Sequence, residues 1–184
     1  MPNFKLVNPL ILGNLETDFS GKNIDNVAGD VWNSLSKYFS GNVPRFGFSL
    51  KNDSNDKLHH FMVKEKVSNN KIVDYSIENL DVELTNDQQK KFVNHINKLS
   101  KNIQEGGKRK RYEDNEDDDS STDTDDIYER LNYYKRINQP FYYWWYNPMI
   151  YTIYGSKYNS IYMPTFSVPF YPYIELDVSS AFFA

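Results

Sequence analysis

The fold class is decided by residues 45–78, RFGFSLKNDSNDKLHHFMVKEKVSNNKIVDYSIE. Three runs in this stretch alternate apolar with polar side chains. The apolar sets are Phe46, Phe48 and Leu50, then Phe61 and Val63, then Val73, Tyr75 and Ile77. A period of two is typical of a strand with one buried face. Turn-forming residues at 52–56 and 69–70 separate the runs. The stretch therefore predicts a three-stranded antiparallel meander.

A helix is predicted on each side of the meander. Before it, Val27, Val31 and Leu35 recur at helical spacing. After it, Thr85 and Gln88 match a capping box. The apolar stripe that follows the box consists of Phe92, Ile96, Leu99 and Ile103. Each stripe can cover one face of a small sheet, so both helices are expected to pack against the meander.

The predicted fold class is α+β, a two-layer domain with the order helix, three-stranded antiparallel meander, helix. Residues 1–22 are expected to form an irregular arm or a short edge strand, because their apolar residues are scattered among turn formers. The predicted organisation is a small α+β domain over 1–105, a disordered basic-then-acidic linker over 106–132, and an aromatic and proline-rich segment, extended or β, over 133–184.

The linker combines two opposite charge runs. Two glycines precede four consecutive cations, Lys108, Arg109, Lys110 and Arg111, and nine of the fourteen residues from 113 to 126 are Asp or Glu. A run of this kind repels itself and has no apolar surface to bury, so disorder is expected. The cations are a candidate nuclear-import signal or a contact for nucleic-acid phosphates. The favoured interpretation is a cationic spacer that the acidic run partly neutralises.

The segment after the linker is unusually aromatic. Between residues 133 and 173, sixteen of forty-one residues are aromatic, and prolines recur at 140, 148, 164, 169 and 172. Proline at this density is expected to exclude long helices and central strands. Aromatic residues dominate interaction hot spots, so the segment supplies the candidate interaction residues. These are Tyr143, Trp144, Trp145, Tyr146, Pro164, Phe166 and Tyr173.

Several roles for the aromatic segment stay open. It can fold back onto the first domain as added strands, or it can be an adhesive arm that orders on a neighbouring subunit. A position in a membrane interface is less favoured, because the run from residue 141 to 154 is too short to span a bilayer. Stacking on single-stranded nucleic acid is a further alternative.

Chemistry-bearing motifs are sparse. The chain has no cysteine, which excludes disulfides, thiolate metal sites and a cysteine nucleophile. His59 and His60 are adjacent on a predicted strand, so their rings should point to opposite faces and should not both line one site. His95 lies beside the second helical stripe. We therefore predict no catalytic, cofactor-binding or metal-binding residue, and no enzymatic activity.

Two further comparisons limit the possible functions. The order of helix, strands and helix also occurs in double-stranded RNA-binding domains, which grip phosphates through a basic helix start. Here the corresponding residues 85–88 read TNDQ and the preceding residues 79–83 read NLDVE, so RNA binding by this domain is disfavoured. The N-terminal residues MPNFKLVNPLILG match neither a secretory signal nor a spanning helix, and a soluble intracellular protein is expected.

The layout resembles a known group of viral proteins. The features that carry this resemblance are GGKRKR at 106–111, the acidic Ser/Thr stretch, YWWYNP at 143–148, and PTF at 164–166 leading into PYIE at 172–175. They are similar to those of uncharacterised proteins of mimivirus-like giant DNA viruses. The resemblance implies a viral product located in the virion or in the host cytoplasm, at the virus factory.

Taken together, the sequence predicts a non-enzymatic structural or interaction protein, a component of a giant-virus virion or virus factory. The aromatic segment would be its contact surface, either for a protein partner or for self-association. The alternative is a nucleic-acid-associated protein that uses Lys108 to Arg111 and the aromatic side chains.

Overall fold

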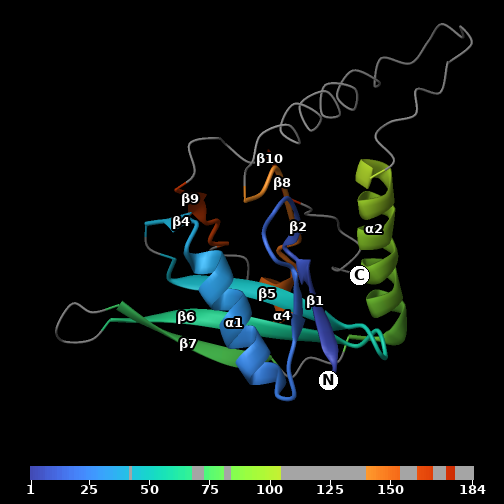
Figure 1. Ribbon diagram of the computed structural model, residues 1–184, viewed down its shortest axis with the longest axis horizontal. Helices are drawn as coiled ribbons and strands as arrows, with labels where there is room; N and C mark the ends of the chain where they lie inside the picture. Colours follow the sequence, from blue (N-terminus) through green and yellow to red (C-terminus); the bar gives the residue numbers. More distant parts are fainter. Residues whose placement is uncertain are drawn as a thin grey trace, which may run out of the picture.

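The computed structural model describes residues 1–41, 43–67, 73–80, 84–104, 140–153, 161–167 and 173–176. Figure 1 shows its strands and helices. In chain order they are β1 (Asn3–Asn8), β2 (Leu10–Leu12), β3 (Asp18–Ser20), α1 (Ile24–Ser36), β4 (Phe39–Ser40), β5 (Arg45–Asn52), β6 (Leu58–Val67), β7 (Val73–Leu80), α2 (Asn86–Gln104), β8 (Tyr143–Tyr146), α4 (Met149–Ile153), β9 (Thr165–Phe166) and β10 (Tyr173–Leu176). The predicted linker, residues 106–132, lies outside the described residues.

The main sheet has five strands in the order β3-β1-β5-β6-β7, and all of its pairs are antiparallel. Strands β5, β6 and β7 form the meander expected from the alternation of apolar residues. Phe46 lies opposite Val63, and Phe48 lies opposite Phe61 with stacked rings 5.3 Å apart. Helices also form at both predicted places.

The predicted two-layer α+β class is wrong, because the structure is mostly β. A curled five-stranded sheet is accompanied by a three-stranded sheet, β10-β8-β2, and a two-stranded sheet, β4-β9. Two of the five strands come from residues 1–22, which were expected to be an arm or a single edge strand. Strand β1 is central rather than peripheral. Its first four residues alternate between exposed and buried, but Leu6, Val7 and Asn8 are buried in succession, which breaks the alternation.

The exclusion of a central strand from the aromatic segment is also wrong. Strand β8 lies between β2, to which it is antiparallel, and β10, to which it is parallel. Pro140 and Pro148 stand outside its four residues, so neither removes a hydrogen bond from the ladder. The seven residues between these two prolines leave room for a central strand of four residues.

The core has two apolar clusters, and the larger one includes residues from both faces of the main sheet, such as Val63 and Met62. Helix α1 covers one face, where Trp32 packs against Phe46 and Tyr75. Helix α2 covers the other face through Phe92 and Ile96, which join the cluster that contains Val7. In Figure 1, α1 crosses in front of the strands and α2 stands at the far end of the sheet. Strand β8 links the two clusters, because its alternate side chains enter different ones: Trp144 and Tyr146 the first, Tyr143 and Trp145 the second.

Two Asn-Pro pairs hold the aromatic segment against the N-terminal strands. The side chain of Asn8, which precedes Pro9, donates to the Asn147 carbonyl at 2.9 Å and accepts from the Asn147 N–H at 3.0 Å. Asn147, which precedes Pro148, in turn accepts from the Met149 N–H at 2.9 Å. Both asparagines are buried, so each bond satisfies a polar group that water cannot reach.

Helix α4 packs the same segment against β5. A Cβ built at Gly47 would lie 2.5 Å from Ile150 Cγ2, so only glycine allows this approach. The Tyr146 hydroxyl donates to the Gly47 carbonyl at 2.7 Å. Burial raises the pKa of Tyr146 well above its ordinary value, which keeps the phenol protonated and able to donate.

Candidate functional site

Four of the predicted interaction residues lie inside the core. Tyr143, Trp144, Trp145 and Tyr146 are each at most 2% exposed. Their apolar area stabilises the fold in this chain and is not presented at the surface. Because none of these four side chains is exposed, the structure gives no support to the prediction that they form a contact surface.

The other three predicted interaction residues lie in or beside strands β9 and β10. Phe166 is half-buried in β9 and packs edge-on against Trp144 at 4.8 Å, and Pro164 just before it is buried. Tyr173 begins β10, the outer strand beside β8. On this strand Ile174 and Leu176 are 38% and 43% exposed. With Met1, they are the exposed large hydrophobic residues of the described chain.

Lys108, Arg109, Lys110 and Arg111 lie outside the described residues. Their role as an import signal or a phosphate contact stays a prediction. Because the β8 aromatics are buried, they offer no stacking surface for bases in this fold. The β8 aromatics therefore lend no support to the nucleic-acid alternative.

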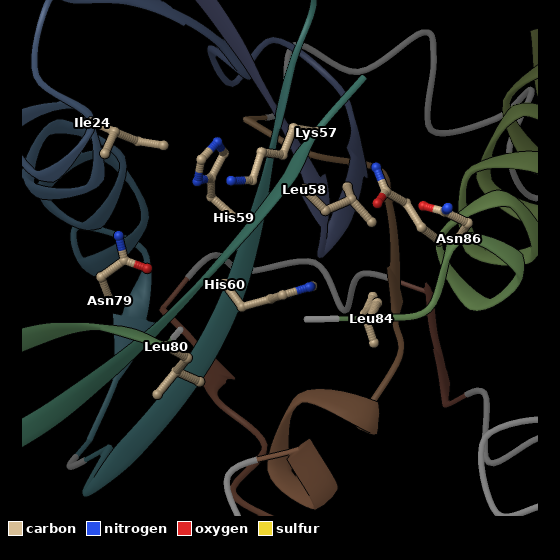
Figure 2. Close-up of a pocket in the computed structure, with 10 residues that line it drawn as sticks. Ile24, Lys57, Leu58, His59, His60, Asn79, Leu80, Leu84 and Asn86 are labelled. Carbon is tan, nitrogen blue, oxygen red and sulfur yellow. The ribbon is translucent and has the colours of Figure 1, made fainter. Parts of the chain in front are cut away.

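A pocket of about 490 Å³ lies beside the start of β6. Strand β7 pairs with β6 only as far as Leu80, opposite His60. Leu58 and His59 of β6 therefore lie beyond the end of β7. The residues that line the pocket are Ile24, Lys57, Leu58, His59, His60, Asn79, Leu80, Leu84, Asn86 and Gln89 (Figure 2).

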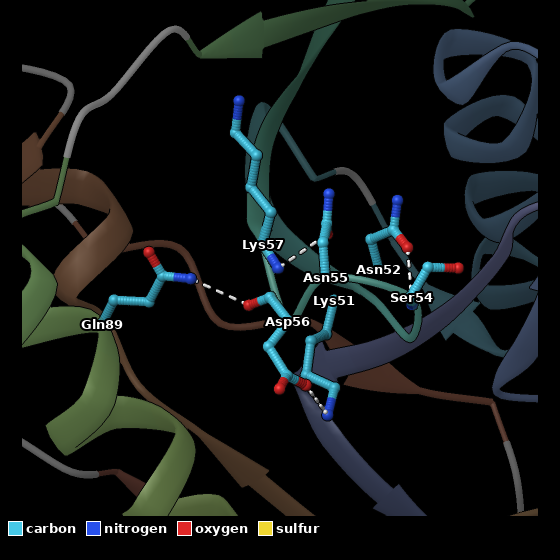
Figure 3. Close-up of polar contacts among 7 residues, drawn as sticks. All are labelled: Lys51, Asn52, Ser54, Asn55, Asp56, Lys57 and Gln89. Carbon is cyan, nitrogen blue, oxygen red and sulfur yellow. Dashed lines mark hydrogen bonds and ion pairs between the residues drawn. The ribbon is translucent and has the colours of Figure 1, made fainter.

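A hydrogen-bonded turn fixes one wall of this pocket. Lys57 N–H donates to the Asn55 side chain at 3.0 Å, and Asn52 N–H donates to the Lys57 carbonyl at 2.9 Å. Gln89 of α2 donates from Nε2 to the Asp56 carbonyl at 2.8 Å, which ties the first turns of α2 to the β5–β6 turn (Figure 3). The Asp56 carboxylate itself pairs with Lys51 at 2.9 Å.

His60 is the most buried polar side chain of the pocket. It is 1% exposed, and its Nδ1 lies 2.7 Å from the Ser49 hydroxyl, which is also buried. Desolvation by burial, and then the neighbouring His59, lower the pKa of His60 from 6.5 to about 4, so the ring is neutral at pH 7. Its Nε2 is buried with no hydrogen-bond partner in the structure. In Figure 2 the ring projects from β6 toward Leu84.

His59 lies on the opposite face of β6, against Phe4, with ring centroids 6.3 Å apart. Burial, and then Lys57, lower its pKa. The two rings do point to opposite faces, as predicted, yet both line one pocket. That part of the prediction is wrong because the pocket extends around the strand where β7 has ended. The only signal in the sequence was a histidine pair placed directly after a turn.

The described residues contain no group of three or more His, Asp or Glu side chains placed to hold a metal ion. None of the helices within the described ranges is long and apolar enough to cross a membrane.

By fold, the chain is a β-rich protein in which an aromatic strand completes the core. It is 27% identical over 173 residues to an uncharacterised protein of Acanthamoeba polyphaga mimivirus, and the match covers 94% of this chain and 93% of that protein. This similarity confirms the resemblance to uncharacterised giant-virus proteins that was drawn from the sequence layout. No protein-family model matches the sequence. No solved structure matches the chain.

Proposed function

We propose that the protein is a non-enzymatic structural component of a giant-virus particle or virus factory, and that it self-associates through strand β10 of the aromatic segment. The observation that carries this proposal is the pair of exposed apolar side chains, Ile174 and Leu176, on an outer strand.

The geometry of β10 favours strand addition. Ile174 lies opposite Trp144, and Leu176 lies opposite Tyr146, so both project on the same face as two fully buried aromatics. Among the described strands β10 has one neighbour, β8, and its second edge offers backbone groups for pairing. Two copies of β10 that pair edge to edge would bury these side chains against one another in an isologous contact.

The proposal of a structural role also draws on the family. The similarity to a mimivirus protein supports a giant-virus product, and the sequence carries no catalytic motif. Components of a particle or factory are present in many copies, and at high local concentration even a weak self-complementary surface binds a second copy.

Sedimentation velocity over a concentration series tests the proposal. We expect the wild-type chain to form dimers or larger species, and the double variant Ile174→Lys, Leu176→Lys to stay monomeric because two charges would be buried in the contact. Glu175→Lys is the matched control: it adds a cation on the same strand, but on the opposite face.

Circular dichroism first establishes that each variant keeps the wild-type fold. A wild-type chain that is monomeric at every concentration would remove the proposal. Self-association that the double variant leaves unchanged would place the contact away from β10.

A further inference from the structure

The pocket beside β6 contains a buried polar atom that the protein itself does not satisfy. His60 Nε2 has no hydrogen-bond partner in the structure, although the ring is 1% exposed and held in place at Nδ1. A buried nitrogen left unpaired costs free energy, so such atoms are usually matched by a ligand or by water. This atom belongs to a pocket of about 490 Å³, within the range of small-molecule sites.

The Ser49 hydroxyl determines which ring nitrogen of His60 carries the proton. Ser49 is fully buried, and His60 Nδ1 is the one side-chain partner that the structure gives its hydroxyl, at 2.7 Å. If Ser49 only accepted from Nδ1–H, its own O–H would be buried without an acceptor. Ser49 therefore donates to Nδ1. In the neutral ring the proton then resides on Nε2, which presents an N–H donor to the pocket.

Ser49 does not itself line the pocket. Its hydroxyl orients the ring but does not face the pocket, so the pair is not arranged as a nucleophile and its base. The geometry points to binding without reaction, and Ser49 acts as a positioning residue.

The other residues that line the pocket indicate which further groups a ligand should have. Asn86 contributes a primary amide, which can both donate and accept, and it is exposed at the rim. Asn79 lies opposite Phe61, so its side chain projects on the other face of the sheet from His60. Leu58, Leu80 and Leu84 supply apolar surface. An uncharged ligand matches this combination: a carbonyl oxygen accepts from His60, an adjoining N–H meets an amide, and a small ring contacts the leucines.

We propose that this pocket binds a small uncharged molecule with an amide or lactam group, whose carbonyl oxygen accepts a hydrogen bond from His60 Nε2. The site is independent of strand β10 and of any self-association.

Side-chain ¹H–¹⁵N NMR of the full chain, titrated with 2-pyrrolidinone, tests the proposal. In the free protein His60 should show a protonated Nε2. The probe should then shift this resonance saturably, along with the side-chain amide of Asn86. His60→Phe keeps most of the ring volume but removes the donor, so binding should weaken about tenfold. His95→Phe is the matched control, because His95 lies on α2 and does not line the pocket.

Each other outcome overturns the proposal. A free protein whose His60 carries its proton on Nδ1 refutes the donor assignment, and this readout needs no variant. Saturable shifts with inorganic phosphate but not with 2-pyrrolidinone would show an anion site instead. The absence of shifts with either probe would show that water alone occupies the pocket.

Discussion

Gly47→Ala tests whether helix α4 sits on strand β5 as the structure places it. The added methyl group would lie 2.5 Å from Ile150 Cγ2 and 3.0 Å from Ile150 Cδ1, so the helix or the side chain must move. Overpacking of a well-filled core costs about 1–3 kcal/mol. Replacing glycine by alanine within a strand otherwise adds about 0.5–1 kcal/mol. The net expectation is a loss of about 1–2 kcal/mol in the free energy of unfolding.

Urea denaturation of four chains measures this effect: wild type, Gly47→Ala, Ile150→Ala and the double variant. Ile150→Ala alone should cost about 2–5 kcal/mol, because Ile150 is fully buried. In that background the alanine at position 47 meets open space, so it should be neutral or stabilising. The cycle should give a favourable coupling of about 1–2 kcal/mol.

Gly29→Ala is the matched control, because Gly29 lies within α1 and no atom stands within 4 Å of its added Cβ. It should raise the free energy of unfolding by about 0.5–1 kcal/mol. The reasoning is refuted if Gly47→Ala is as stabilising as Gly29→Ala, or if the Gly47 effect is the same with and without Ile150.

Three further predictions follow from the buried contacts. Asn8→Ala should lower the free energy of unfolding by about 2 kcal/mol or more, because it leaves the Asn147 N–H and carbonyl buried without their partner. Urea denaturation measures this loss, and an unchanged midpoint would contradict the prediction. The His60 pKa of about 4 lies below its unfolded value of 6.5, so the unfolded chain binds the proton more strongly; stability from this group is full above pH 6.5 and falls by about 3 kcal/mol as the pH drops to 4. That pH-dependent part should vanish in His60→Gln, and an identical pH profile in the two chains would disprove it. A chain that ends at Gly107 lacks β8, β9, β10 and α4, so it should lose the cooperative thermal transition of the full chain; an equally sharp transition at the same temperature would contradict this.

The local elements of the fold were predictable where large apolar side chains alternate with polar or small ones. The alternation in β5 and β7, and the stripes of the two helices, are read directly from the sequence because their periods are distinct. Strands β1 and β8 carry a weaker signal. Every residue of β8 is buried, and the last three residues of β1 are buried in succession, so neither strand sustains a period of two.

The candidate site was hidden for a different reason. Ser49 and His60 are eleven residues apart, and only the β5–β6 register places them opposite each other. The aromatic residues drew attention because exposed aromatics mark interfaces, but composition alone cannot tell an interface from a core. The contact between Asn8 and Asn147 spans 139 positions, a separation that no local pattern reports.

Hydrogen exchange in the intact chain tests most directly whether the aromatic segment is part of the core. The amides of Tyr143–Tyr146 should exchange as slowly as those of Phe48 and Phe61 at the centre of the main sheet, because all should open only through global unfolding. Asn55, in the exposed β5–β6 turn, provides the fast reference. If the β8 amides exchange as fast as Asn55 while Phe48 and Phe61 stay protected, the segment is not a structural strand and the fold described for it is wrong.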